Sequence, residues 1–439
     1  MVACIALAAI LTHVLPAGKY DRRDDPVTGK SVVVAGSYKP VPANPLSFFQ
    51  TLLAIPKGLM SAGSVIFFVM LVGGAFTVVD KTGALQSAVD ALVSRVGNKG
   101  WLVIPILGIA FAVGGVVENM QEEILAFVPV LMLLTRRLGF RPVIGVALSM
   151  GTAAVGSAFS PINPFQVGIA QKLAGLPLLS GAGFRIVVLI IGVSLWIAWT
   201  VTRTRSARSE AENRPDPEVR AAVGTMGVRQ ICVLLCVITA FAFLIIGVSK
   251  WDWDFDQLSG MFFFMGVAAG IIGGLGAAGT ADGFVEGFRG MAYAAVLIGF
   301  ARAIFVVMDE GRIVDTVVNA LFTPLSHFPV AVSAVGMIGA QTVIHIPVPS
   351  VSGQAVLTMP LLIPLSDLLG LSRQVTVLAY QTGAGLCELI TPTNGALMAM
   401  LAACNVKYDE WLRFVAPIYA ALLVLGAGAV FIAIAIGLK

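Results

Sequence analysis

Charged side chains are scarce in this sequence. Only 12% of its 439 residues are Asp, Glu, Lys or Arg, and 58% are hydrophobic, whereas about a quarter of the residues in a soluble domain are charged. Several uninterrupted apolar runs approach the roughly twenty residues that a membrane-spanning helix needs. Because backbone polar groups in lipid must be satisfied within helices, the composition predicts an all-α polytopic membrane protein. The net charge of +4 is small, so the lipid bilayer is the expected partner and nucleic acid is not.

The sequence also has few histidines and lacks a nucleotide-binding motif. The three histidines, His13, His327 and His345, form no metal-binding pair, and no nucleophile motif is present. The sequence lacks GxxxxGK[ST], which disfavours a self-contained ATP-driven pump. We therefore expect neither an enzyme nor a cofactor, and no metal beyond a transported coupling ion. A channel remains an alternative to a secondary transporter.

A short polar signature interrupts apolar sequence twice. Residues 160–164 read Ser-Pro-Ile-Asn-Pro, and residues 391–395 read Thr-Pro-Thr-Asn-Gly. Proline removes a backbone donor and clashes with the preceding turn, so each copy predicts a broken helix. Broken helices at corresponding places in two halves indicate a transporter binding site.

The two halves align at a constant offset of 231 residues, which pairs Pro129 with Pro360 and Asn163 with Asn394. Each half reads as a span, an interfacial helix, a re-entrant hairpin, a broken span and a span. An arginine-rich linker between the halves belongs in the cytoplasm by the positive-inside rule, and counting spans from it predicts an inverted repeat. The predicted divisions are a first repeat 1–202, with hairpin 100–138 and broken helix 142–173; a cytoplasmic linker 203–229; a connecting transmembrane helix and outside loop 230–257; and a second repeat 258–439, with hairpin 327–368 and broken helix 372–404.

Other segments are predicted as follows. Residues 1–16 resemble a first transmembrane helix more than a signal peptide, because they have no basic n-region and no convincing cleavage site. Residues 17–57 are expected to form a polar, partly structured cap. Residues 84–96 have the apolar spacing of a helix lying in the membrane interface. A short polar turn with Asp282, Glu286 and Arg289 is expected before a span at 292–308.

The first hairpin has an acidic tip, Glu-Asn-Met-Gln-Glu-Glu, at residues 118–123. A re-entrant hairpin can place such a tip at mid-depth against protein or water. Were the segment two full spans, these carboxylates would be loop residues instead. The repeat favours the hairpin, because it aligns this tip with the uncharged residues 349–354.

Four segments resemble the YfcC family of bacterial inner-membrane permeases. They are Gly-Ser-Ala-Phe-Ser-Pro-Ile-Asn-Pro-Phe at 156–165, Val-Gly-Ile-Ala-Gln at 167–171, Pro-Ala-Gly at 16–18 and Gly-Gly-Ala-Phe at 73–76. This family is grouped with the C4-dicarboxylate anaerobic carriers in the ion transporter superfamily. The resemblance implies a multi-pass, elevator-type secondary transporter of the bacterial inner membrane, commonly a homodimer.

The resemblance leaves the substrate open, since members are described as dicarboxylate carriers and as basic amino acid or arginine/ornithine exchangers. Sodium–dicarboxylate relatives carry Ser-Asn-Thr at both hairpin tips. This chain has Glu118 and Asn119 at one tip and Ser-Val-Ser-Gly-Gln at 350–354 in the other. That departure weakens a sodium–dicarboxylate assignment.

Candidate substrate- or ion-binding residues lie at the tips and in the broken helices. Interrupted helices offer unpaired backbone groups and dipole ends, although each asparagine could instead cap the next half-helix, and the acidic tip could lie in water at the membrane surface. The candidates are Glu118, Asn119, Glu122, Ser160, Asn163, Ser350, Ser352, Gln354, Glu388, Thr391 and Asn394.

Three further groups have open roles. Glu388 could neutralise a substrate ammonium, carry a coupling proton or pair with Arg302. Arg302 could bind a substrate carboxylate or serve in that structural ion pair. His345, a lone histidine, fits a hydrogen-bonded packing residue.

The charge balance of these groups favours an ammonium-bearing substrate, because carboxylates outnumber the single arginine. The predicted function is symport or exchange of a small amino acid-like solute, with basic amino acids favoured and Na+ or H+ as the coupling ion. A C4-dicarboxylate or other carboxylate carrier is the main alternative.

Overall fold

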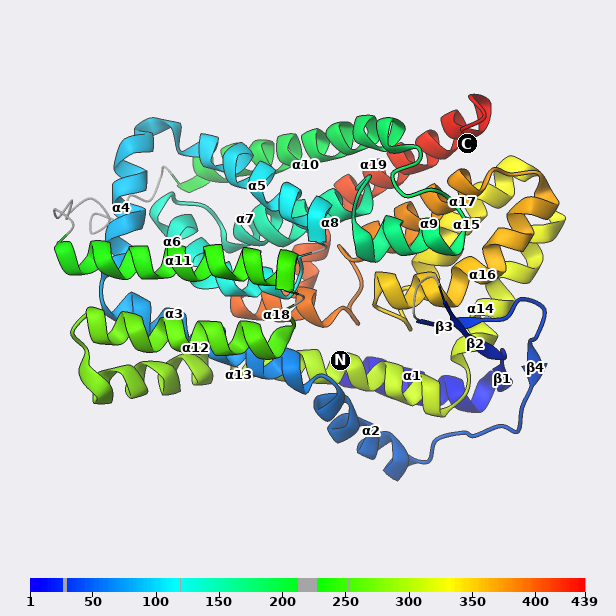
Figure 1. The fold of residues 1–439 in the computed structure, drawn as a ribbon, viewed down its shortest axis with the longest axis horizontal. Coiled ribbons are helices and arrows are strands. Elements are labelled where there is room, and N and C mark those ends of the chain that lie inside the picture. Colours follow the sequence, from blue (N-terminus) through cyan, green and yellow to red (C-terminus); the bar gives the residue numbers. More distant parts are fainter. Residues whose placement is uncertain (27–29, 119, 212–226, 252, 439) are drawn as a thin grey trace.

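The computed structural model describes residues 1–26, 30–118, 120–211, 227–251 and 253–438. Helices dominate these residues, and most of them run along the long axis of the molecule (Figure 1). Within the described residues, seven helical segments are long and apolar enough to cross a membrane: Gly63–Lys81, Gly100–Val117, Ala182–Thr204, Phe255–Ile272, Gly276–Glu310, Val351–Leu369 and Tyr408–Ala435.

The N-terminal segment forms the expected cap at one end of the molecule. Two antiparallel strand pairs, β1 with β4 and β2 with β3, follow the first helix. Tyr20 N donates to Asp315 Oδ2 (3.0 Å), and Arg22 pairs with Asp315 Oδ1 (2.9 Å), which ties the cap to α14. The elements are α1 (Val2–Val14), β1 (Gly18–Lys19), β2 (Arg22–Asp25), β3 (Lys30–Val33), β4 (Lys39–Pro40) and α2 (Phe48–Ser61).

The helix α2 corrects the expectation of a loop up to residue 57. Ser47 Oγ accepts from Gln50 N, and Gln50 Oε1 accepts from Ser47 N, which together make a capping box. This pair starts a helix ten residues before the expected boundary of the loop.

Four long helices form one layer of the molecule, with α3 packed against α12 and α13. The expected polar turn at Asp282, Glu286 and Arg289 is wrong, because these residues belong to the single 35-residue helix α13. Glu286 pairs with Lys81 of α3 (2.7 Å), so a charged stretch is accommodated without ending the helix. The layer contains α3 (Gly63–Lys81), α11 (Val228–Trp251), α12 (Phe255–Ile272) and α13 (Gly276–Glu310).

Short helical elements occupy the ranges predicted for the first hairpin and the first broken helix. The amphipathic helix α4 (Ala84–Val96) matches its predicted bounds, and α10 continues past the predicted span end at residue 202. Residues 212–226 of the predicted linker lie outside the described part of the chain. The elements are η1 (Gly97–Leu102), α5 (Val103–Glu118), η2 (Glu123–Phe127), α6 (Val128–Arg137), α7 (Pro142–Val146), η3 (Ala147–Gly151), α8 (Thr152–Ala158), η4 (Pro164–Gly168), α9 (Ile169–Leu173) and α10 (Ala182–Ala211).

The second half repeats this order. The α15–α16 hairpin lies in the right half of Figure 1, whereas α5 and α6 lie in the left half. Asn163 caps η4 and Asn394 caps α18, so the two signatures break their helices in the same way. The elements are α14 (Val314–Phe322), η6 (Thr323–His327), α15 (Val330–Ile344), α16 (Val351–Leu369), α17 (Arg373–Tyr380), η7 (Gln381–Gly385), α18 (Gly395–Ala403) and α19 (Tyr408–Ala435).

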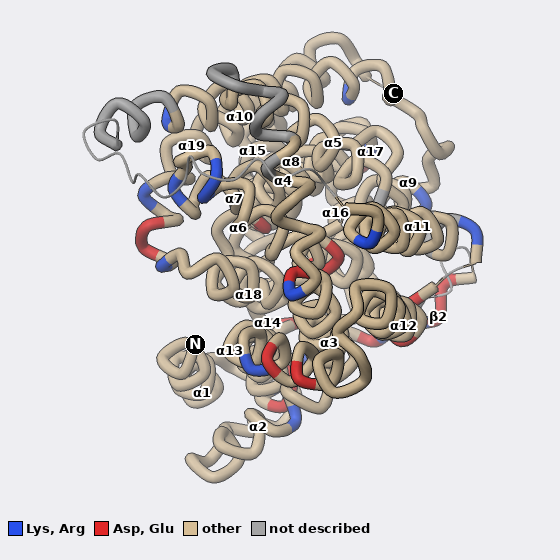
Figure 2. The backbone as a smooth tube through the Cα atoms, turned by 90° about the vertical axis from the view of Figure 1, so that its left-hand side faces the viewer, with Lys and Arg blue, Asp and Glu red and all other residues tan. Residues whose placement is uncertain are grey.

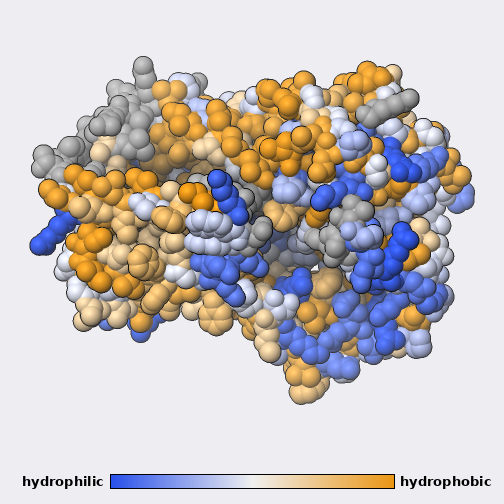
Figure 3. Space-filling view, in the orientation of Figure 1, coloured by the Kyte–Doolittle hydropathy of each residue, from blue (hydrophilic) through white to orange (hydrophobic). Residues whose placement is uncertain are grey.

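The surface agrees with a membrane environment. Charged residues occupy only short stretches of the backbone seen end-on (Figure 2). The face in Figure 3 is largely hydrophobic, and its hydrophilic part gathers mainly on the side where Figure 1 places the β-strands. Exposed apolar side chains such as Phe67, Ile109 and Ile190 are suited to contact lipid.

Candidate functional site

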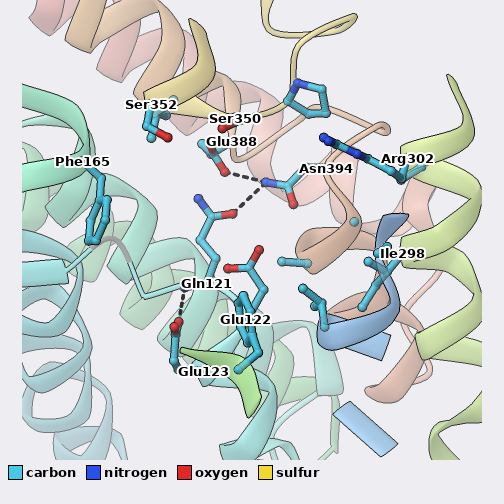
Figure 4. A pocket seen from close by; sticks show the side chains of 18 of the residues that line it. Gln121, Glu122, Glu123, Phe165, Ile298, Arg302, Ser350, Ser352, Glu388 and Asn394 are labelled. Atoms are coloured by element: carbon cyan, nitrogen blue, oxygen red, sulfur yellow. Dashed lines mark hydrogen bonds between the residues drawn. The ribbon is translucent and has the colours of Figure 1, made fainter. Parts of the chain in front are cut away.

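A cavity of about 480 Å³ lies where the two hairpin tips meet the second broken helix (Figure 4). Small-molecule sites commonly have this size. The first tip (residues 120–123) and the second tip (residues 347–352) both contribute to its wall, together with α12, α13 and the break before α18. The charged residues that line it are Glu122, Glu123, Asp254, Arg302 and Glu388.

The first tip is held by its own backbone and by the second half of the chain. Gln121 N donates to Glu123 Oε2 at 3.2 Å, which folds the tip back on itself. Gln121 is buried, and its Oε1 accepts from Asn394 Nδ2 at 2.8 Å. The neighbouring Glu122 lines the cavity, and its carboxylate points into the space between the tips.

The second tip supplies hydroxyl groups. Ser350 and Ser352 line the cavity, and Ser350 Oγ accepts from Gly353 N at 3.2 Å as the cap of α16. The positive end of the α16 dipole therefore faces the same space as these hydroxyls. Gln354 is placed differently, because it is buried between His345 and Gln341 and does not line the cavity.

The second broken helix provides the link between the tips. Asn394 Nδ2 lies 2.5 Å from Glu388 Oε2, and Asn394 Oδ1 accepts from Leu397 N at 3.0 Å. Asn394 thus caps α18, orients Glu388 and reaches the first tip. Thr391 is buried and donates to its own helix at Cys387 O (2.8 Å), so it is not part of the cavity wall.

Residues 160–164 of the first signature do not line this cavity, although the next residue, Phe165, does. Asn163 is fully buried, with Oδ1 accepting from Phe165 N and Gln166 N at 3.0 Å and Nδ2 donating to Gly115 O at 2.9 Å. Ser160 Oγ donates to Val116 O (2.7 Å). These contacts match the capping alternative. A separate cavity of about 270 Å³ borders the first signature without reaching either of these two polar side chains.

Some of the remaining predicted residues lie outside the described part of the chain, and the others have identifiable partners. Asn119 and the side chain of Glu118 lie outside the part of the chain that the structure describes. Arg302 lines the cavity, but its Nε donates to Ser61 Oγ at 3.1 Å, and the pair with Glu388, one of the alternatives considered, is not formed. Glu388 instead has Asn394 and His345 as neighbours. His345 is buried and hydrogen-bonded, as predicted.

Two residues that line the cavity, Gln121 and Thr393, were not predicted from the sequence. Gln121 was overlooked among the carboxylates of its tip, although the 231-residue offset aligns it with the candidate Ser352. Thr393 lies within the second signature, lines the cavity and donates to Ile346 O at 2.6 Å. Among the residues that the structure describes, no cluster of three or more His, Cys, Asp or Glu side chains could hold a metal.

Known proteins resemble the whole chain. Residues 1–435 match the family model described as C4-dicarboxylate anaerobic carrier, DcuC. A protein of Escherichia coli (strain K12) named "Putative basic amino acid antiporter YfcC" is 35% identical over 391 residues, which cover 84% of this chain and 76% of that protein. An uncharacterised protein of Haemophilus influenzae is 28% identical over 417 residues, or 91% of this chain and 81% of that one.

A solved structure gives a weaker match. The YdaH transporter of Alcanivorax borkumensis, described as having an unusual topology, has a TM-score of 0.46 and 17% identity, covering 99% of this chain and 98% of that one. The similarity in sequence is much stronger and confirms the resemblance noted above. The chain therefore belongs to the C4-dicarboxylate anaerobic carrier family and is a multi-pass membrane transporter rather than an enzyme.

Proposed function

We propose that this protein is a secondary-active transporter that exchanges or symports a small amino acid-like solute, with basic amino acids as the first candidates. The observation that carries the proposal is the lining of the cavity between the tips. Glu122, Glu388, Ser350 and Ser352 all line it, and Figure 4 shows Glu388 beside Ser350, with Glu122 on the side of the first tip. The name of the Escherichia coli relative points to the same substrate class.

The carboxylates and hydroxyls that line the cavity suit the two ends of an amino acid. An ammonium group is favoured beside Glu122 and Glu388, because a carboxylate offers charge-assisted hydrogen bonds. A substrate carboxylate is favoured near Ser350 and Ser352, where the N-terminus of α16 adds positive potential. Arg302 at the wall is available to the same end of the substrate.

We further propose an elevator mechanism in a homodimer of the bacterial inner membrane. The two hairpins, with α7–α10 and α17–α19, would form the moving transport body, and α1–α3 with α11–α13 the scaffold. This division follows the predicted inverted repeats 1–202 and 258–439. Its support is the matching order of helices in the two halves and the meeting of both tips at one cavity.

A carrier of C4-dicarboxylates is the second candidate, because the family description names that substrate. Arg302 and the two serines could receive one carboxylate. A dianion would also meet Glu122, Glu123 and Glu388, and repulsion by these groups disfavours it. The inventory of charges therefore supports the amino acid over the dicarboxylate.

The test is counterflow into proteoliposomes that contain the purified chain. Vesicles preloaded with lysine, arginine, ornithine or succinate are mixed with the same labelled solute, with and without sodium and proton gradients. Saturable uptake of the basic amino acids supports the proposal, and uptake of succinate alone contradicts it. Unsaturable conductive flux would indicate a channel instead.

A further inference from the structure

A buried pair of titratable side chains lies directly behind the cavity. His345 is 0% exposed and Glu388 is 5% exposed. Nε2 of His345 lies 3.3 Å from Oε1 of Glu388. Within the described part of the chain, this Nε2 has no hydrogen bond of good geometry, so the carboxylate is the polar group it faces.

The hydrogen bonds around the imidazole decide which nitrogen carries its proton. Nδ1 of His345 lies 2.8 Å from Oε1 of Gln354, and Nε2 of Gln354 donates to Gln341 O at 2.7 Å. Turning the Gln354 amide around would place its oxygen against that carbonyl oxygen. Gln354 therefore presents an acceptor to the imidazole, and Nδ1 is the protonated nitrogen.

This orientation leaves a conflict that one more proton removes. In neutral His345, Nε2 carries a lone pair, and it faces a carboxylate oxygen that carries lone pairs too. Two buried acceptors at this distance repel each other, and a proton carried by Nε2 or Oε1 removes that repulsion. We infer that His345 and Glu388 hold one exchangeable proton between them, and that the transporter exchanges this proton for its cationic substrate.

The exchange follows from the position of Glu388 and rests on the function proposed above. Glu388 lines the cavity with the carboxylate that also contacts His345. With the proton the pair is neutral overall, and without it the pair carries one negative charge. An ammonium group that binds Glu388 replaces the lost positive charge, while the proton leaves Nε2 or Oε1 for water in the cavity. One proton therefore moves against one substrate cation.

Other titratable or charged side chains surround the pair. Tyr380 Oη donates to Val351 O (2.5 Å), and Cys387 Sγ donates to Thr342 O (3.3 Å). Neither side chain therefore replaces Glu388 as the partner of His345 Nε2. The titratable or charged groups near the pair are Glu122, Glu123, Asp254, Arg302, Tyr380, Cys387 and Tyr419.

The experiment compares two assays on the full chain in proteoliposomes. Lysine counterflow at equal pH measures substrate exchange, and lysine uptake driven by an acidic interior measures proton coupling. For one-for-one exchange, each unit of pH gradient changes the accumulation ratio about tenfold. His345→Gln keeps a hydrogen-bonding side chain but cannot titrate, so we expect counterflow to remain and gradient-driven accumulation to be lost. The matched control is His327→Gln, at an exposed histidine, which should retain both activities.

A second readout needs no variant. Adding lysine to the wild-type protein in weakly buffered detergent should release about one proton per lysine bound, as followed with a pH-sensitive dye. Unchanged gradient-driven uptake by His345→Gln, no proton release, or a requirement for sodium would overturn the proton inference and leave the proposed function intact. Absence of lysine counterflow in the wild type would overturn the proposed function and the inference together.

Discussion

Asn394 donates to Gln121 across 2.8 Å, although the two residues are 273 positions apart in the sequence. The contact joins the second broken helix to the tip of the first hairpin. Because Asn394 also contacts Glu388, one amide group fixes the position of both halves of the cavity wall. A change in the first hairpin would therefore be transmitted to the carboxylate that we assign to the substrate.

Replacing this asparagine should affect both stability and binding. Asn394→Ala removes a helix cap, which costs about 1 kcal/mol of unfolding free energy. It also frees Glu388 from its fixed orientation, and we expect the half-saturating lysine concentration to rise about five- to tenfold. Thermal unfolding in detergent and counterflow kinetics measure the two effects separately.

Asn163→Ala is the matched control, because Asn163 caps η4 and does not itself line the cavity. It should lower stability by a similar amount while leaving the half-saturating concentration nearly unchanged. Equal losses of affinity in the two variants would show that capping alone, and not contact with the site, explains the role of Asn394.

Ser350 should matter for the carboxylate end of the substrate. Ser350→Ala removes a cap worth about 1 kcal/mol and one hydroxyl of the second tip. Competition by lysine for labelled lysine should weaken, whereas competition by cadaverine, which lacks the carboxylate, should change little. The control is Ser372→Ala, since Ser372 caps α17 outside the cavity. Parallel losses for lysine and cadaverine would rule out a carboxylate subsite at the second tip.

The contact between α5 and α8 should tolerate no added atoms. A Cβ at Gly156 would collide with the backbone oxygen of Ala112, while a Cβ at Gly339 would meet open space. Gly156→Ala is expected to lower the unfolding free energy by about 1–3 kcal/mol through overpacking. Gly339→Ala should be neutral or stabilising, because alanine favours the helix. A melting temperature for Gly156→Ala equal to that of the wild type would mean that this helix pair adjusts freely.

Much of the fold was predictable because local chemistry specifies it. The combination of proline and asparagine in the two signatures predicted the helix breaks, and apolar spacing defined α4 to the residue. The start of α2 was missed although its capping residues, Ser47 and Gln50, stand in the sequence. The continuity of α13 could not be read locally, because Lys81 of another helix supports its charged turn.

The site was only partly predictable for a similar reason. The repeat identified which tips and breaks were candidates, but it could not show which polar groups were already used. Ser160 and Thr391 have sequence surroundings like those of the residues that line the cavity. In the structure, however, both hydroxyl groups donate hydrogen bonds to backbone carbonyl oxygens. Only the folded structure shows that the Glu388 carboxylate lies against Asn394 and His345.

The most direct test of the central claim is lysine and succinate counterflow by the wild type, Glu122→Gln and Glu388→Gln. We expect the wild type to prefer lysine, and each variant to lose at least about tenfold in lysine affinity, because a substrate charge loses its partner. Glu410→Gln, which breaks an ion pair with Arg141 away from the cavity, serves as the control. Full lysine counterflow in both cavity variants, or a wild-type preference for succinate, would contradict the account.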